Sequence, residues 1–326
     1  MIVKNIKPFK GKHCETTATG TLLNQLNIEL SEPMLFGLGE GLGFIFWNVK
    51  IMDFPFIGGR VKPDLLTQNI ARNLKLQLTV KETSSTQKAW ENVKGYIDKG
   101  IIVGLKLDCF HLEYFSNPIH FAGHYVALYG YDDNFSYLVD TQQQGGFVKT
   151  SLKSLELARN EKGPMSSKNL FYTMGKTKEE YNIKDAVLIA IRNNAKEYLN
   201  PPITNIGYKG ILKTSVEIKK WFQQSKNIER DFCTTAMLME KAGTGGALFR
   251  NLYRDFLKES YELLQFDKLK KAHMDFISIA DQWTLTASLF DKVGKSKEIK
   301  YIDQTSEILK DISIKEKKVM EQLATI

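Results

Sequence analysis

The spacing of apolar residues changes character near residue 175. Before that point helical spacing alternates with short strand-like runs, whereas from Lys176 onward apolar residues recur only at helical intervals. Groups of proline and glycine separate the later segments, so we expect helices at about 178–199, 213–224, 231–241, 247–264, 272–289 and 296–322. The pattern predicts an α+β domain over 1–175 followed by an all-α helical domain over 176–326.

The first part of the chain supplies the strands. The run 101–107 is nearly continuous and β-branched at its start, so it is expected to be buried on both faces at the centre of a sheet. Helices are expected from Cys14, from Asp64, from Thr86 to near Gly100 and at 152–159, and further strands at 76–81, 121–130, 135–140 and 145–149.

Several glycine-rich stretches need an explanation. Residues 31–47 carry alternating glycines, but their spacing fits neither phosphate-binding template, so we expect close backbone packing before an apolar strand and no nucleotide. Residues 54–60 and 162–167 are expected to be a turn-rich connector and a loop. The glycines at 243–246 could bind an anion at a helix start, but a tight turn between helices is favoured.

Cys14 stands where an irregular, basic stretch becomes an apolar periodic segment through Leu22, Leu23 and Leu26. The first turn of a helix is the positive end of its peptide dipoles, which lowers the pKa of a thiol and favours the nucleophilic thiolate. A free cysteine is more often a small buried hydrophobe. Position alone therefore leaves both interpretations open.

A predicted hairpin brings a histidine and an aspartate together. Residue numbers across a turn centred on Asp132 and Asp133 sum to about 265, and those of His124 and Asp140 sum to 264, so we expect the last two nearly opposite. A carboxylate fixes the tautomer of an imidazole, and that imidazole can hold a thiolate. Cys14, His124 and Asp140 thus have the types and chain order of a papain-like triad, the alternative being a structural histidine beside a strand-end aspartate.

Other metal-type and thiol side chains are assigned no site. Cys109, His111, His120 and His124 suggest a metal, but on a strand His120 and His124 stand too far apart to share one ion, and no Cys-x-x-Cys pair is present. We therefore expect no metal. Cys233 falls in a helical apolar stripe and is expected in the core.

Composition narrows the class of protein. The 326 residues are 43% hydrophobic and 25% charged, which is ordinary for a globular chain, and three cysteines argue for a reducing compartment. The net charge of +8 is spread, with Lys plus Arg against Asp plus Glu at 19 to 16 up to Gly175 and 26 to 21 beyond. No secretory signal or membrane span is visible, so we expect a cytoplasmic protein that binds neither nucleic acid nor membrane.

Three short stretches carry a family resemblance. Residues 13–16 (His-Cys-Glu-Thr), 31–37 (Ser-Glu-Pro-Met-Leu-Phe-Gly) and 123–126 (Gly-His-Tyr-Val) resemble the N-terminal domain of the butirosin biosynthesis protein H family, and 245–250 (Gly-Gly-Ala-Leu-Phe-Arg) the domain that follows it. The resemblance implies a papain-like fold, similar to bacteriocin-leader peptidases, with Cys14 as nucleophile, His124 as base and Asp140 orienting it. One departure is that residues 10–13 lack the glutamine that helps form the papain oxyanion hole.

The resemblance also implies an activity and partners. The named family member is an acyltransferase that moves an aminoacyl group from an acyl carrier protein thioester to an aminoglycoside amine. A cysteine-dependent acyltransferase would accordingly take its acyl group from a carrier or pantetheine thioester and pass it to a small-molecule amine, without a cofactor. A cysteine hydrolase or peptidase with the same triad, and a non-catalytic binding protein, remain open, as does the oligomeric state.

Overall fold

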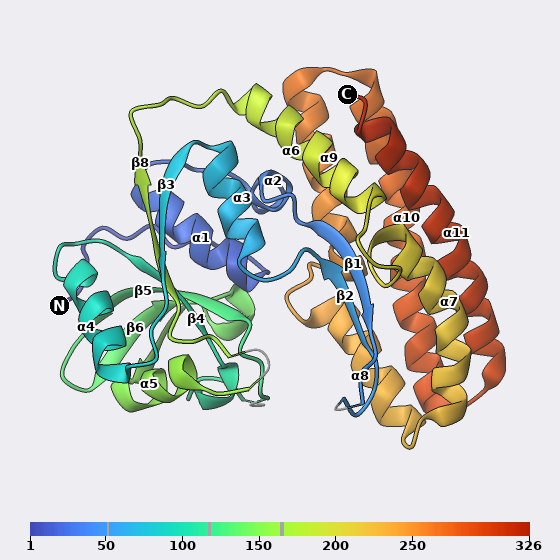
Figure 1. The fold of residues 1–326 in the computed structure, drawn as a ribbon, viewed down its shortest axis with the longest axis horizontal. Helices are drawn as coiled ribbons and strands as arrows, with labels where there is room; N and C mark the ends of the chain where they lie inside the picture. The colour runs from blue at the N-terminus through green and yellow to red at the C-terminus, as the bar shows by residue number, and fades with distance from the viewer. Residues whose placement is uncertain (51, 117–118, 164–165) are drawn as a thin grey trace. The chain divides into compact units, whose positions relative to one another are not determined.

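The computed structural model describes all residues except 51, 117–118 and 164–165. The chain forms two compact units, Met1–Leu35 with Pro63–Tyr181, and Phe36–Lys62 with Asn182–Ile326. The α+β class is confirmed, since helices accompany two antiparallel sheets (Figure 1). Residues 36–62, expected in the first domain, belong to the second unit because their strands pack against its helices.

The first unit is organised around a six-stranded antiparallel sheet. Its strands are β3 (Leu76–Lys81), β8 (Phe171–Lys176), β4 (Val103–Leu107), β5 (His124–Tyr131), β6 (Phe135–Val139) and β7 (Phe147–Ser151), in that order across the sheet. The expectation of a central buried strand is confirmed, because β4 lies between β8 and β5 and its Val103 and Leu105 are buried. Strand β8 was not expected.

Helices pack on this sheet and begin largely where the sequence predicts. They are α1 (Cys14–Gln25), α3 (Leu65–Asn73), α4 (Thr86–Ile97) and α5 (Leu152–Asn160), with the short 3-10 helices η1 (Cys109–His111) and η2 (Gln142–Gln144). Ser85 and Ser151 cap α4 and α5 by accepting the amides of Lys88 and Ser154. Helix α1 contacts β5 and β4, which places the cysteine at its start beside the central strands. The loop expected at 162–167 falls partly outside the described residues.

The second unit is a helical bundle with an added hairpin. It contains α6 (Ile183–Leu199), α7 (Gly207–Gln224), α8 (Ile228–Lys241), η3 (Ala247–Phe249), α9 (Arg250–Leu264), α10 (Asp267–Ser296), α11 (Ile299–Leu323) and the strands β1 (Leu42–Trp47) and β2 (Phe56–Arg60). Helix α2 (Glu32–Leu38), which was not expected, spans the boundary between the units. The expectation of a turn-rich connector at 54–60 is wrong, because Phe56–Arg60 form strand β2, which pairs with β1. Cys233 is half-buried, not a core residue.

A buried ion pair lies in the core of this bundle. Arg250 and Glu316 are both fully buried, with Arg250 Nε 2.8 Å from Glu316 Oε1. Glu316 also accepts hydrogen bonds from the indole of Trp283 at 2.7 Å and from the hydroxyl of Tyr198. Arg250 donates to the carbonyls of Gly59 and of a residue in η3, so the pair joins helices α6, α9, α10 and α11 to strand β2.

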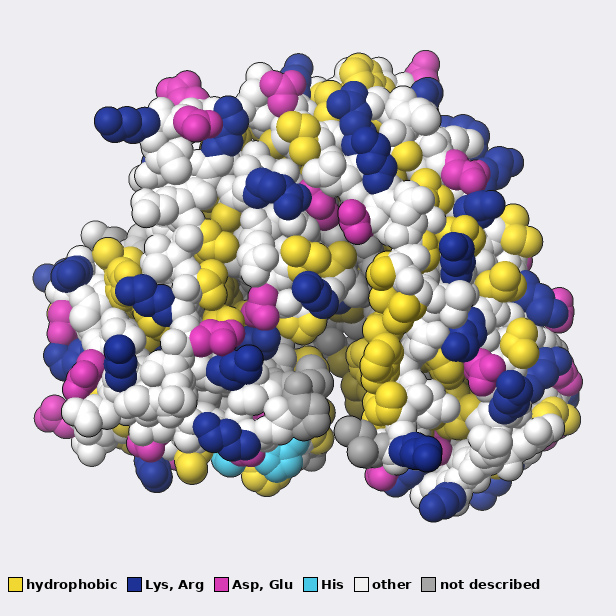
Figure 2. All heavy atoms as spheres, in the orientation of Figure 1, with side chains coloured by type: hydrophobic (Ala, Val, Ile, Leu, Met, Phe, Trp, Pro, Cys, Tyr) yellow, Lys and Arg dark blue, Asp and Glu magenta, His cyan; other side chains and the backbone are white. Residues whose placement is uncertain are grey.

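The surface charges are mixed. Figure 2 shows Lys and Arg side chains scattered among acidic ones over the visible face, with no single basic patch. Among the described residues, no helix combines the length and the apolar character that crossing a bilayer requires.

Candidate active site

The loop before Cys14 is fixed by a carboxylate from α2. Glu32 accepts the amide of Lys12 at 2.9 Å, the amide of His13 at 2.8 Å and the hydroxyl of Thr16 at 2.8 Å. His13 is extended and its carbonyl begins α1, so the helix starts at Cys14. The thiol therefore lies in the first helical turn, as the sequence predicts, and is half-buried.

Helix α1 is buried although much of it is polar. The hydroxyls of Thr17 and Thr21 donate to carbonyls one turn earlier, at His13 and Thr17, which satisfies them without water. Glu15 is fully buried and accepts both the amide and the hydroxyl of Thr67 from α3. These contacts fix the helix that carries the thiol.

A glycine brings the loop after β6 to the loop before Cys14. A Cβ atom on Gly11 would lie 2.4 Å from the Thr17 hydroxyl, closer than side-chain atoms approach, so only glycine fits. The Gly11 carbonyl accepts the amide of Gln142 at 3.2 Å. The segment that follows Asp140 is thereby tied to the segment that precedes Cys14.

His124 and Asp140 are hydrogen-bonded, so the expectation that they are neighbours is confirmed. His124 is the first residue of β5 and Asp140 follows the last residue of β6, and His124 Nε2 lies 2.8 Å from Asp140 Oδ2. Ala127 pairs with Val139, so numbers on facing residues sum to 266 at this end of the hairpin. His124 and Asp140, whose numbers sum to 264, are therefore two residues away from facing each other directly, an even offset that keeps both side chains on one face of the sheet.

The shift has a local cause. The carbonyl of Phe135 accepts the amide of Asp132, which centres the turn on Asp133 and Asn134, one residue later than expected. A β-bulge between Leu128 and the following pair then removes part of the offset.

Asp140 holds two further groups. It is 1% exposed, and its Oδ2 also accepts the hydroxyl of Tyr114 at 2.8 Å while Oδ1 accepts the amide of Thr141 at 2.6 Å. The ring of Phe115 stands edge-on to the His124 ring, with centroids 5.3 Å apart. The connection between η1 and β5 thus supports both members of the pair.

The electrostatics favour a charged imidazole. Burial lowers the pKa of His124, but the charge of Asp140, its hydrogen bond, and the hydrogen bond and charge of Cys14 together raise that pKa well above its ordinary value. Since Nε2 is bonded to Asp140, Nδ1 is the nitrogen left for Cys14. The structure therefore brings Cys14, His124 and Asp140 together.

The other two thiols of the chain lie in different surroundings. Burial raises the pKa of the Cys109 thiol to about 11, and burial also raises the pKa of the Cys233 thiol.

The backbone amides around Cys14 differ in whether they can stabilise an oxyanion. The amides of Lys12 and His13 donate to Glu32, so they do not point at a substrate beside Cys14. The amide of Cys14 itself lies at the start of α1, where helical amides lack a partner within the helix.

Sequence reasoning missed Glu32 and Tyr114. Glu32 lies in one of the stretches that carried the family resemblance, but its role as an acceptor for the cysteine loop depends on a contact between two helices. Tyr114 lies in a segment with no periodic signal, and no pattern in the sequence indicates its hydrogen bond to Asp140.

The first unit is therefore an α+β domain in which Cys14, His124 and Asp140 lie close together. Residues 13–141 match the model described as butirosin biosynthesis protein H, N-terminal, and residues 153–323 match a domain of unknown function, DUF4872. Residues 13–141 thus form a domain of the butirosin biosynthesis protein H, N-terminal, type, and the chain belongs to the family defined by the DUF4872 domain that follows, whose match covers more than half of it. A search of curated proteins found no match to the chain.

Proposed function

We propose that this chain is a cysteine-dependent acyltransferase in which Cys14 accepts an acyl group from a carrier thioester and passes it to an amine. The observation that carries the proposal is the buried hydrogen bond between His124 and Asp140, with Cys14 close enough to help raise the pKa of the imidazole. A half-buried thiol at a helix start, beside a histidine whose pKa is raised, is suited to nucleophilic catalysis. A cysteine helix packed on an antiparallel sheet that bears the histidine also supports a papain-like fold for this unit.

The proposed reaction has two steps. The Cys14 thiolate attacks the thioester carbonyl carbon, the bond from that carbon to the pantetheine sulfur breaks, and the departing thiolate takes the proton of the His124 imidazolium. An amine then attacks the acyl-Cys14 carbonyl, His124 takes the amine proton, and the Cys14 thiolate leaves. The imidazolium and thiolate are thereby restored, and Asp140 holds His124 in the required tautomer throughout.

The match of residues 13–141 to the butirosin biosynthesis protein H N-terminal domain, a resemblance that implies transfer to an amine, supports this acceptor over water. The donor we propose is an acyl carrier protein or a related pantetheine thioester, and the acceptor is a small-molecule amine. A cysteine hydrolase would use the same three residues, so the two differ in the fate of the acyl-enzyme.

Intact-protein mass spectrometry with acyl-pantetheine donors tests the proposal. We expect an adduct of one acyl group on the wild-type chain. The matched control is Cys233→Ala, which removes a half-buried thiol of the second unit and should still carry the adduct. Cys14→Ala should carry no adduct, and amines should discharge the wild-type adduct faster than water does. Cleavage of peptides without any acyl loading would instead favour the hydrolase, and a folded chain that shows neither reaction would exclude catalysis by Cys14.

A further inference from the structure

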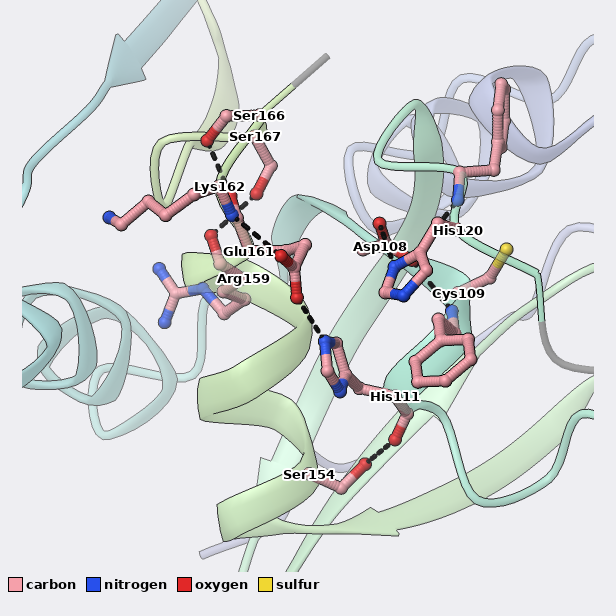
Figure 3. A network of polar contacts seen from close by, with 12 residues as sticks. Asp108, Cys109, His111, His120, Ser154, Arg159, Glu161, Lys162, Ser166 and Ser167 are labelled. Carbon is pink, nitrogen blue, oxygen red and sulfur yellow. Dashed lines mark hydrogen bonds and ion pairs between the residues drawn. The ribbon is translucent and has the colours of Figure 1, made fainter. Parts of the chain in front are cut away.

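A second cluster of reactive side chains lies at another place in the first unit. His111, His120 and Glu161 each offer one ligand atom, and these atoms all lie within 4.8 Å of one another. His111 ends η1, Glu161 follows the last residue of α5, and His120 lies in the connection to β5 (Figure 3). Residues from three separate places in the chain thus converge, and none of them contacts Cys14 among the described interactions.

Two of the ligands are oriented by other groups. Asp108 is 2% exposed; its Oδ1 accepts the amides of Phe110 and Phe121, and its Oδ2 lies 3.4 Å from His120 Nδ1 (Figure 3). A carboxylate that holds one imidazole nitrogen leaves the other nitrogen facing outward as a ligand, which is the usual arrangement around metal-binding histidines. This carboxylate is built into the backbone turn, so it does not move with the exposed His120 ring.

The carboxylate ligand is oriented in the same way. Oε1 of Glu161 accepts the amide of Lys162 at 3.0 Å, which leaves Oε2 for the cluster. That oxygen lies 2.5 Å from His111 Nε2. The carbonyl of His111 in turn accepts the hydroxyl of Ser154 from α5, so the two elements that carry these ligands are joined directly.

We propose that His111, His120 and Glu161 bind a zinc ion, with one coordination position left open. Two imidazoles and one carboxylate are a donor set that zinc prefers, commonly completed by water. Ligands at about 2.0–2.1 Å in a tetrahedron lie about 3.3 Å from one another. Binding therefore requires the His111–Glu161 contact to open slightly and the three ligand atoms, now within 4.8 Å of one another, to draw together around the ion.

The cluster is open to entry by an ion. The His120 side chain is 58% exposed, against 18% for His111 and 28% for Glu161. Histidine side chains reach the surface of this unit in Figure 2. An ion can therefore reach the cluster from the side of His120, the most exposed of the three ligands. The proposal departs from the expectation that Cys109, His111, His120 and His124 bind no metal, because His111 and His120 are joined here by Glu161, which the sequence did not indicate.

The ion would also link two residues of the same connection, His111 and His120. His111 and His120 stand at the two ends of a segment that carries Tyr114 and Phe115, which contact Asp140 and His124. A shared ion restrains both ends of that segment. The site stands independently of the acyltransferase proposal, because its ligands and its test do not involve Cys14.

Zinc binding by the full-length chain, measured by competition with a chromophoric chelator, is the primary test. We expect one ion per chain in the wild type, and an affinity at least about 100-fold lower in His120→Ala, which removes a ligand, and in Glu161→Gln, which replaces an anionic ligand by a neutral, weaker one. Asp108→Asn should weaken binding by about 10- to 100-fold through loss of ligand orientation. Controls are His273→Gln, in the second unit, and Glu156→Gln, an exposed residue of α5, and both should bind as the wild type does.

Cobalt(II) substitution identifies the ligand atoms. The visible spectrum should report nitrogen and oxygen ligands without a thiolate charge-transfer band. His120→Ala changes an exposed side chain, so a circular dichroism spectrum equal to wild type is expected and any loss of binding reports on the site. The proposal is overturned if the wild type binds no stoichiometric zinc, if His120→Ala binds it equally well, or if cobalt shows thiolate ligation.

Discussion

Asp140→Asn replaces a carboxylate in the His124 pair by an amide of the same size. In the native chain Oδ1 accepts the Thr141 amide at 2.6 Å, and Oδ2 accepts from Tyr114 and faces His124 Nε2, each at 2.8 Å. The Thr141 amide keeps the oxygen of the new side chain, because an N–H cannot donate to an NH₂ group. The NH₂ group of the new asparagine then faces His124 Nε2, so Nε2 must be unprotonated and accept a hydrogen bond from it. His124 is left with its proton on Nδ1, the nitrogen that faces Cys14.

The magnitude follows from the hydrogen bond that is lost. A hydrogen bond to a charged group contributes about 1.5–3 kcal/mol, and the variant removes it from the imidazolium form of His124. The imidazolium–thiolate state of His124 and Cys14 should fall by about 10- to 150-fold relative to the neutral pair. Any turnover should fall by more, on the order of 10⁴-fold, because the remaining tautomer cannot take a proton from the substrate side.

Alkylation by iodoacetamide near neutral pH, followed by peptide mapping, measures this effect at each thiol. In the wild type Cys14 should react fastest, and Asp140→Asn should slow only that site by about 10- to 150-fold. Cys109 and Cys233 serve as internal references, and Asp133→Asn, an exposed change in the same hairpin, should react as the wild type does. A Cys14 rate within about twofold of wild type in a folded Asp140→Asn protein would refute the reasoning.

Three further predictions follow from contacts in the two units. Because Cys14 contributes to the raised pKa of His124, Cys14→Ala should lower that pKa in an NMR titration, and no change would argue against their contact. In the wild type the stability contributed by His124 is complete below the ordinary histidine pKa and is lost as pH rises through the raised value. Glu316→Gln leaves the buried arginine without its counter-charge and should lower the free energy of unfolding by about 3 kcal/mol in urea titrations, whereas a loss below about 1 kcal/mol would contradict this. Gly104→Ala places a Cβ 2.2 Å from a tyrosine ring and should cost about 1–3 kcal/mol in thermal melts, while Gly175→Ala, with open space, should be tolerated.

Local signals were enough to predict the elements that carry the candidate site. The helix at Cys14, the hairpin of β5 and β6, and the proximity of His124 and Asp140 all depend on patterns within about 20 residues, and the structure contains each of them. The turn was displaced by one residue because Asp132 and Asp133 both suit a turn. Its centre is set by the backbone hydrogen bond from Asp132 to Phe135 and by the Asp132 carboxylate, which accepts the amides of Asn134 and Phe135.

Features that depend on distant pairing were not predictable in this way. Strand β8 pairs with β3 across about a hundred residues, Leu76 with Lys176, and its sequence lies where the helical pattern begins. Strand β2 contains Gly58 and Gly59, which suggest a turn until β1 is known to lie beside it. The role of Glu32 likewise arises only when α2 packs beside the loop before Cys14.

The interrupted order of the two units has a consequence during synthesis of the chain. Strands β1 and β2 leave the ribosome before residues 63–181, yet Phe44, 1% exposed in the finished protein, is buried in a unit whose helices α6 to α11 all lie after residue 182. At about 5–20 residues per second, translation of the intervening 119 residues takes about 6 to 24 s. Throughout that interval the nascent chain carries an apolar hairpin whose packing partners have not been made, so the second unit can complete its core only after the whole first unit has been synthesised.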